Sequence, residues 1–533
     1  MRIENQMPRH NERGIALVLA LFLVSALSVL GASLMFLAQT ETNASMNYRM
    51  MSQVRYAAES GVQKASNFVL DPAFLTPADT AALLGVNCNR NVSPVTCLQA
   101  GVQNPVVLSA TAAMPSNYPI AAVQTAFNAA GQGTMAAGNS TLTYNSYATL
   151  MGLQQFDAYG GGTSVTATWQ LTGTGGLVGY SKAVVEILAL GETPKVSASS
   201  YAAFSTANTC AAMAFHGNVT IDSYDSSIGP PTGAGNSTTA TGGDVGTNGN
   251  LDIQGSVSVE GNLYSPRTGV GTCTQGNVSA LSEIGSAQVT GSIIKLPAEV
   301  QFPAPVFSTI PPTSTVTVNA ALLAGTPAAA CSALGLTLVT NCLVNAATKT
   351  ITVDGHGLDV TLPSVSIASG YIVVFVGHAG PAANVNVNSL SGSGEIQIQA
   401  NMGATNLNES VVLKVAGKNP DGTDMAAPFD LSTMSWKQNA TVNAANKFDA
   451  SAVQIVYGGP GTISMKGNDQ SAVTIYAPNA AFTLQGTPDI YGSILAKTIL
   501  SAGNADIHYD RRLKRDFYVV GHPIMGTFNW KRF

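Results

Sequence analysis

Few residues in this chain have the types and spacing that catalysis needs. The 533 residues contain no HExxH, GxSxG or GxxxxGK[ST] motif, so zinc-protease, serine-hydrolase and P-loop chemistries have no support in the sequence. His216, His356 and His378 each lie beside a glycine and offer imidazole groups of the kind that bind metals. Because histidines in such positions are more often turn or surface residues, we predict no metal.

One group of charged residues resembles a polysaccharide-cleaving site in composition, and it consists of Asp489, Asp506, Asp510, Arg511 and Arg512. The sequence DRRLKRD at 510–516 is more typical of a solvated edge that caps a β structure and prevents aggregation. NPDGTD at 419–424 offers oxygen ligands for calcium, but its Asp-Gly pair and the lack of a suitably placed glutamate favour a turn. We predict a protein that is not an enzyme and has no cofactor.

The six cysteines are Cys88, Cys97, Cys210, Cys273, Cys331 and Cys342. An even number is typical of disulfides in an oxidising compartment. Cys88 with Cys97 and Cys331 with Cys342 would close short loops, which leaves Cys210 with Cys273. Six cysteines allow about 15 pairings, so the connectivity stays open. A zinc site would need CxxC-like spacing, which the sequence lacks.

The composition indicates a folded, β-rich protein. Only 10% of the residues are charged and 45% are hydrophobic, with 53 glycines and a net charge of −5. Many apolar residues are β-branched, which favours strands with glycine turns over disorder. The length predicts more than one domain. The chain offers no large basic surface, so we predict no nucleic-acid partner.

The N-terminal residues predict one long helix that crosses a membrane. The run from Ile15 to Ala38 has about 24 residues without charge, enough to span a bilayer and too long for a signal-peptide core. Helix-compatible residues continue to Leu70, with apolar positions every three or four residues from Tyr48 to Val69. Basic residues before the run keep that end cytoplasmic and place everything after Ala38 outside.

The segment RGIALVLALFLVSALSVLGASLMFLAQTETNASMNYRMMSQVRYAAESGVQ resembles the N-terminal segment of type IV pilins, specifically of PilX-type accessory pilins. The resemblance covers about 60 residues. Its features are a basic leader ending in Arg13-Gly14, an apolar stretch from Ile15, and the AAESG motif with Ala57, Ala58, Glu59 and Gly61. It implies that a prepilin peptidase removes residues 1–14, and that the apolar stretch first anchors the subunit and later packs into a fibre.

One departure from major pilins implies a position in that fibre. Major pilins carry a glutamate at the fifth mature position, which is Leu19 in this chain. A carboxylate in a membrane costs about 2.5–3.5 kcal/mol unless it is paired, and in pilins the partner is a neighbour's terminal amine. Leucine suits a fibre end, as in tip-located minor pilins and type II secretion pseudopilins. A plain membrane anchor is the alternative.

We predict a leader at 1–14, a transmembrane part at 15–38, an exposed helix continuation at 39–71 and a pilin-like α+β head at 72–195. Strand-like runs at 140–152, 163–173 and 181–191 predict an antiparallel sheet of three or four strands. The sheet should cover the apolar face of the helix with Val165, Ala167, Trp169, Val184, Val185 and Ile187.

The rest of the chain predicts a large, mostly-β region. Short alternating strands with glycine and asparagine corners fill a first tract at 196–300 and a second at 349–533, which has a basic and aromatic tail. A proline-rich stapled insertion or linker separates them at 301–348. We favour a right-handed β-helix, with a β-sandwich as the alternative. GSILAKTILSAGNADIHYDRRL also resembles the closing segment of β-helical surface domains on large pilin-like proteins.

The predicted protein is a structural minor pilin or pseudopilin, a low-copy tip or initiating component of a type IV pilus-like fibre. Its β-helical domain would serve adhesion or bind an unknown surface ligand. Expected partners are the prepilin peptidase, other pilins or pseudopilins, and the inner-membrane assembly platform. We expect a single-pass inner-membrane protein with a periplasmic domain that later lies in the fibre or at the cell surface. The alternatives are a membrane-anchored β-helical protein acting on polysaccharide and a type II secretion pseudopilin.

Overall fold

The computed structural model describes residues 13–71, 74–138, 140–157, 163–178, 180–193, 195–228, 231–233, 236–305, 307, 310–379, 384–399, 409–431, 434–438, 448–467, 470–515, 517–520 and 524–532. The predicted leader up to residue 12 lies outside this set. The chain forms two compact units. The first runs to residue 154 and adds 167–193 and the strand at 524–532, and the second comprises 155–166 and the chain from 194 to 522.

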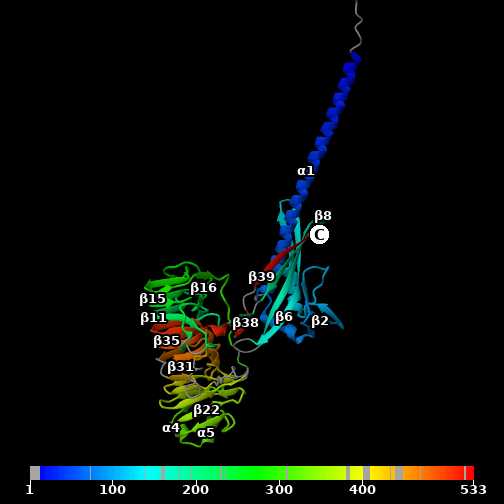
Figure 1. Ribbon diagram of the computed structural model, residues 1–533. Helices are drawn as coiled ribbons and strands as arrows, with labels where there is room; N and C mark the ends of the chain where they lie inside the picture. The colour runs from blue at the N-terminus through cyan, green and yellow to red at the C-terminus, as the bar shows by residue number, and fades with distance from the viewer. Residues whose placement is uncertain are drawn as a thin grey trace, which may run out of the picture. The chain divides into compact units, whose positions relative to one another are not determined.

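The first unit is built on one helix, α1 (Arg13–Leu70), which has 58 residues and is about 87 Å long. It confirms the prediction of a long apolar N-terminal helix. Its N-terminal half extends beyond the other elements of the unit (Figure 1). Buried positions recur from Val54 to Val69 at steps of three and four residues. Tyr48 is 78% exposed, so the buried stripe begins later than the sequence suggested.

An antiparallel sheet covers the C-terminal half of α1, with the order β39-β8-β7-β6-β4 and β5 paired to β6. Its strands are β4 (Val107–Ser109), β5 (Gln132–Ala137), β6 (Ser140–Asp157), β7 (Thr163–Leu177), β8 (Tyr180–Glu192) and β39 (Ile524–Arg532). The predicted number of strands was too low, because β4, β5 and β39 also join. Ala167 and Trp169 are buried and Val165 is partly buried, while the side chains of Val184, Val185 and Ile187 lie outside the described set.

The strand β39 corrects the predicted boundaries, because it returns from the far end of the chain. It pairs with β8, with Trp530 opposite Ile187. Residues 524–532 therefore belong to the first unit and not to the tract that begins at 349. The smaller elements of this unit are α2 (Pro77–Ala81), α3 (Ala121–Ala130), β1 (Cys88–Asn89), β2 (Thr96–Gln99) and β3 (Val102–Pro105).

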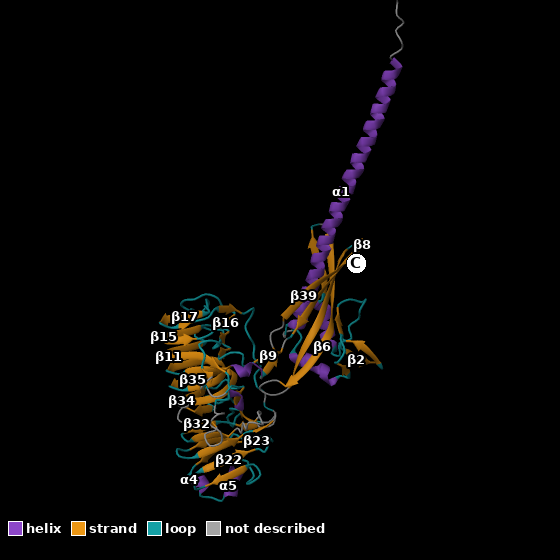
Figure 2. Ribbon diagram, in the orientation of Figure 1, coloured by secondary structure: helices purple, strands orange, loops and turns teal. Residues whose placement is uncertain are grey.

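The second unit is a stack of short strands with two short helices at one end (Figure 2). Its elements include β9 (Lys195–Ser197), β10 (Ala203–Ser205), β11 (Met213–Tyr224), β14 (Val245–Thr247), β15 (Leu251–Val259), β16 (Leu263–Ser265), β17 (Leu281–Gly285), β18 (Gln288–Val289), β19 (Ile293–Lys295), β20 (Thr315–Val318), α4 (Ala320–Leu323), α5 (Pro327–Ala333), β21 (Cys342–Asn345), β22 (Thr350–Asp354), β23 (Val360–Leu362), β24 (Ser364–Ile367), β25 (Ile372–Val376), β26 (His378–Ala379), β27 (Asn384–Val387), β28 (Leu390–Gly392), β29 (Glu395–Gln399), β30 (Glu409–Val415), β31 (Phe429–Leu431), β32 (Ser435–Gln438), β33 (Val453–Tyr457), β34 (Ile463–Gly467), β35 (Gln470–Gly486), β36 (Asp489–Gly503), β37 (Asp506–Asp510) and β38 (Tyr518–Val520).

Parallel strands stack in register so that like residues form ladders through the interior. One ladder runs through Ile293, Leu263, Val245, Ala203, Ile494, Ile475, Ile455, Leu413, Val385 and Val360. Another runs through Leu281, Leu251, Met213, Ile499, Phe482, Ile463, Phe429, Leu390, Val365 and Val316. Nearly all of these side chains are buried, and burying each aliphatic one stabilises the fold by about 1.5–3 kcal/mol. The ladders therefore form one continuous core.

The order of strands in space differs from their order in the chain. The strands β10 and β11, which open the first tract, pair with β36 and β37, which close the second. The prediction that 510–516 caps an exposed end was therefore wrong. Asp510 ends β37 between two neighbours and is 0% exposed. Its Oδ1 accepts hydrogen bonds from the backbone N–H groups of Ser226 and Arg512, both at 3.1 Å, whereas its Oδ2 is buried without a hydrogen-bond partner among the described residues.

The end of the first tract at Val300 and the start of the predicted linker at 301–303 run along the stack and are fixed to it. The Val300 N–H donates to Asn248 Oδ1 at 2.7 Å, and Asn248 Nδ2 donates to the Val300 carbonyl at 2.8 Å. The Tyr476 hydroxyl donates to the Pro303 carbonyl at 2.7 Å. The ring of Phe302 packs edge-on against Phe204, with 5.1 Å between centroids. This segment therefore contributes to the packing of both tracts.

The remainder of 301–348 forms β20, α4, α5 and β21, and a disulfide joins Cys331 in α5 to Cys342 in β21. The other disulfides in the structure are Cys88–Cys97 and Cys210–Cys273. Cys210 precedes β11 and Cys273 lies between β16 and β17, so this bridge links two loops of the first tract.

A matched pair of arginines tests how the end of the second tract is fixed to the rest of that tract. Arg512 Nη1 lies 2.6 Å from Asp449 Oδ2, and the Asp449 side chain is 8% exposed. We expect Arg512→Ala to lower the free energy of unfolding by about 2–3 kcal/mol, because it leaves a mostly buried carboxylate without its cation. The neighbouring Arg511 is exposed, so Arg511→Ala should change the free energy of unfolding by less than about 0.5 kcal/mol. Calorimetry of the detergent-solubilised chain measures both, and equal losses would contradict this account.

Candidate functional site

The helix α1 has two halves with opposite surroundings. Every side chain from Ile15 to Arg49 is exposed, whereas Val54, Ala58 and Val62 are 0% exposed. The exposed half is also the apolar half, and by length and composition it can cross a membrane. An apolar surface this large needs lipid or other helices to cover it. This half of α1 is therefore the principal candidate for a functional surface.

Five hydroxyl side chains in the exposed half donate hydrogen bonds to the helix backbone. The hydroxyls of Ser25, Ser28 and Ser33 donate to the carbonyls of the fourth preceding residues at 2.7–2.8 Å. Thr40 and Thr42 do the same at 2.8 and 2.7 Å. Hydroxyls bonded in this way bring no unsatisfied donor into a lipid environment. The uncharged run from Ile15 to Thr40 is therefore compatible with a bilayer despite its serine and threonine residues.

The C-terminal half of α1 contacts the sheet backbone to backbone. A Cβ atom on Gly173 of β7 would lie 2.2 Å from the Ala58 carbonyl oxygen, and one on Gly175 would lie 2.1 Å from the Val54 carbonyl oxygen. On the helix side, a Cβ on Gly61 would lie 3.0 Å from the Asn145 carbonyl oxygen of β6. Side chains at these positions would separate the helix from the strands. Small residues therefore set the distance between α1 and the sheet.

The structure gives the AAESG residues distinct positions. Ala57 and Ala58 are fully buried, and Gly61 is buried against the sheet. Glu59 instead faces solvent and pairs with Arg55 one turn earlier at 2.9 Å, a contact that contributes little to stability. The motif thus combines a packing surface with one exposed charge.

At the other end of α1, Arg13, Gly14 and Ile15 are helical, and the side chains of the first two lie outside the described set. Leu19 is 63% exposed in the middle of the apolar surface. The sequence places Gly173 at the end of the predicted strand 163–173 and Gly175 in the connection after it, and neither glycine was predicted to contact the helix. The sequence feature that could have predicted this contact is the pair of glycines on either side of Thr174, because a glycine inside a strand often marks a place where another backbone approaches closely.

Comparison with known families decides the nature of this helix. Residues 13–63 match the family model described as PilX N-terminal. The N-terminal helix is thus similar to the N-terminal segment of PilX-type minor pilins. The family implies membrane anchoring, a larger extracellular part and contact with other pilins in a fibre.

Other comparisons concern the rest of the chain. Residues 382–516 match a domain of unknown function, DUF7305, which spans much of the second tract. No curated protein matches the chain. Among solved structures, the competence-associated pilin ComZ from Thermus thermophilus aligns with 13% identity over 91% of this chain and 98% of that one, at a TM-score of 0.29. At that score the alignment supports no conclusion about the PilX-type chain.

In the second unit, the charged group near the C-terminus separates into two sets. Asp489, Asp506 and His508 lie together, with ligand atoms within 4.8 Å of one another. Burial raises the pKa of Asp506, and the neighbouring Asp489 raises it further. Asp510 lies apart in the interior, where burial raises its pKa to about 6. Arg512 points to Asp449, so the five predicted residues do not form one converging site.

The other chemically active residues are also placed. His216 Nε2 lies 3.2 Å from Asp252 Oδ2 as a two-residue pair. His356 and His378, from separate segments, come together at Asp354. In NPDGTD the Gly422 N–H donates to the Asn419 carbonyl at 2.9 Å, which makes the predicted turn.

The close approach of helix and sheet in the first unit can be tested with glycine substitutions. We expect Gly175→Ala to lower the free energy of unfolding by about 1–3 kcal/mol, because the added methyl overlaps the Val54 carbonyl of α1. Gly152 of β6 is the control, since a Cβ there would meet only Thr168 at 3.7 Å. Thermal unfolding of the solubilised chain compares them. Equal stability of the two variants would refute a backbone-to-backbone contact.

Proposed function

We propose that this PilX-type protein is a low-copy minor pilin that sits at the tip or initiating end of a type IV pilus-like fibre, without catalysis of its own. The observation that carries the proposal is the uncovered apolar half of α1, which has no charge from Ile15 to Thr40. Lipid would cover it before assembly, and the helices of neighbouring pilins would cover it afterwards. The same surface would then serve first as an anchor and later as a fibre contact.

The proposed partners follow from the resemblance to pilins. A prepilin peptidase would cut between Gly14 and Ile15, and an inner-membrane platform would move the mature subunit into the fibre. Because the apolar stretch lies after the cut, it would be retained. The second unit would then lie outside the membrane, where it would contact a surface ligand or partner.

We further propose that the second unit is a right-handed β-helix. In-register parallel strands, alternation of buried and exposed residues as in β15 and β29, and one shared core support a solenoid. The strand pairings join segments roughly 20–40 residues apart along most of the second tract. A solenoid of this size would crowd the shaft of a tightly packed fibre, and this also favours a position at an end.

Processing is tested by the N-terminus of the protein in its own membrane. Mass spectrometry should find a chain that starts at Ile15, and Gly14→Ala should leave the leader attached while the protein remains in the membrane. Gly31→Ala is the control, because Gly31 lies in the same apolar stretch with nothing within 4 Å of an added Cβ. An intact leader on the unmodified protein, in cells that contain the peptidase, would refute cleavage at this site.

Position in the fibre is tested at Leu19. Immunogold labelling of the second unit should mark fibre ends or the cell-surface base. A carboxylate introduced by Leu19→Glu would cost about 2.5–3.5 kcal/mol in the membrane and would need a neighbour's amine, so labelling should shift toward the shaft. Leu23→Glu carries the same charge one turn away and should only reduce insertion.

Two results would contradict the end position. One is dense labelling along the whole shaft by the unmodified protein. The other is a distribution for Leu19→Glu that matches that of the unmodified protein, which would remove the positional meaning of the leucine.

A further inference from the structure

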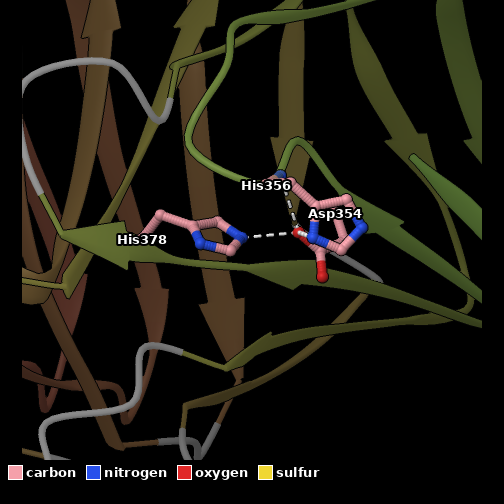
Figure 3. A group of neighbouring side chains, drawn as sticks. All are labelled: Asp354, His356 and His378. Carbon is pink, nitrogen blue, oxygen red and sulfur yellow. Dashed lines mark hydrogen bonds and ion pairs between the residues drawn. The ribbon is translucent and has the colours of Figure 1, made fainter. Parts of the chain in front are cut away.

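Two histidines and one aspartate meet at the edge of the second unit. Asp354 ends β22, His356 lies two residues later in a turn, and His378 begins β26. His378 Nε2 lies 2.5 Å from Asp354 Oδ1, and His356 Nδ1 lies 3.5 Å from the same oxygen. Figure 3 shows both imidazole rings directed at one carboxylate. The available ligand atoms all lie within 4.8 Å of one another.

The backbone holds these groups together. Asp354 pairs with Val376 in the register of β22 and β25, which brings His378 two residues beyond that pair. The His356 N–H donates to Asp354 Oδ1 at 2.8 Å and closes the turn. His356 has φ of +48°, a conformation that glycine or asparagine adopts more easily. The turn therefore holds the His356 imidazole beside the Asp354 carboxylate, at a position where glycine or asparagine would fit the backbone more easily.

We infer that Asp354, His356 and His378 form a binding site for a divalent transition-metal ion, with zinc as the best fit. Two imidazole nitrogens and a carboxylate oxygen suit zinc and exclude a preference for calcium or magnesium, which take oxygen ligands. Tetrahedral zinc holds such ligand atoms about 3.3–3.5 Å apart. The 3.5 Å between His356 Nδ1 and Asp354 Oδ1 already matches this separation. The 2.5 Å between His378 Nε2 and Asp354 Oδ1 would lengthen by about 1 Å when the ion replaces their hydrogen bond.

The exposure of the three side chains fits an ion that enters from solvent. Asp354 and His378 are 22% and 27% exposed, whereas His356 is 61% exposed. The ion would join the turn after β22 to β26, which pairs with β30 through His378 and Ser410. It would therefore bind together segments from successive coils of the stack. The fourth coordination position would face solvent and hold water.

The experiment uses the untagged full chain in detergent, freed of metal with a chelator. Calorimetric titration with Zn²⁺ should give one site, and Co²⁺ should give the visible absorption of a nitrogen- and oxygen-ligated ion. Asp354→Asn, His356→Asn and His378→Gln should each weaken Zn²⁺ binding by more than about 100-fold, beyond the loss caused by an outer-shell partner. Asparagine suits the φ of residue 356, and glutamine at 378 keeps a donor for Asp354. Zn²⁺ should also raise the melting temperature of the unmodified chain but not that of these three variants.

Two control variants separate this site from other histidines. His216→Ala removes a histidine with an aspartate partner but no third ligand, and His508→Asn removes the other histidine that lies with two carboxylates. Both should leave the Zn²⁺ affinity unchanged. No stoichiometric binding, unchanged binding in the His356 and His378 variants, or loss confined to the His508 variant would each overturn the assignment. If a ligand variant fails to fold, the Co²⁺ spectrum of the unmodified chain decides whether imidazole binds.

Discussion

The apolar half of α1 that nothing in the described chain covers is the constraint on which the rest of this protein depends. A helix can carry such a surface only if lipid or neighbouring helices shield it from water. The absence of charge from Ile15 to Thr40 and the self-bonded serine and threonine hydroxyls make that possible. The same helix then continues into a folded head without a break at the membrane boundary. One continuous helix therefore runs from the apolar half into the head.

The packing of the sheet on α1 depends on small residues on both sides of the contact. Ala57, Ala58 and Gly61 remove side chains from one face of α1, and Gly173 and Gly175 remove them from the facing strand. The two backbones then approach closely, and dispersion contacts replace a thick layer of side chains. Aromatic residues such as Phe68 and Phe127 fill the space where the helix diverges from this contact. A mutation that adds a side chain at Gly173 or Gly175 is therefore expected to push the sheet away from α1 and destabilise the head.

The second unit follows a different logic, because its stability comes from repetition. Each short strand buries few apolar residues by itself, and it gains a core from the parallel strands stacked on either side. The low charge content suits this arrangement, since a charged residue in a ladder would meet like charges or apolar neighbours. Two of the acidic residues that are retained lie beside a basic side chain or an imidazole, Asp449 beside Arg512 and Asp222 beside His508. The cluster at Asp354 belongs to the same class of stacked polar side chains, and its two imidazoles distinguish it.

The sequence by itself determined the long helix, its membrane-compatible half, the resemblance to PilX-type pilins and the β-rich nature of the remainder. These properties depend on composition, on the local period of apolar residues and on short motifs, all of which can be read along the chain. Only the tertiary structure decided that β39 returns to the first sheet, that β11 pairs with β37, and that Asp510 is buried. Those contacts join residues hundreds of positions apart, and alternating apolar residues specify a strand face but not its neighbour. Likewise, His356 and His378 were unremarkable beside their glycines until in-register strands brought them to one carboxylate.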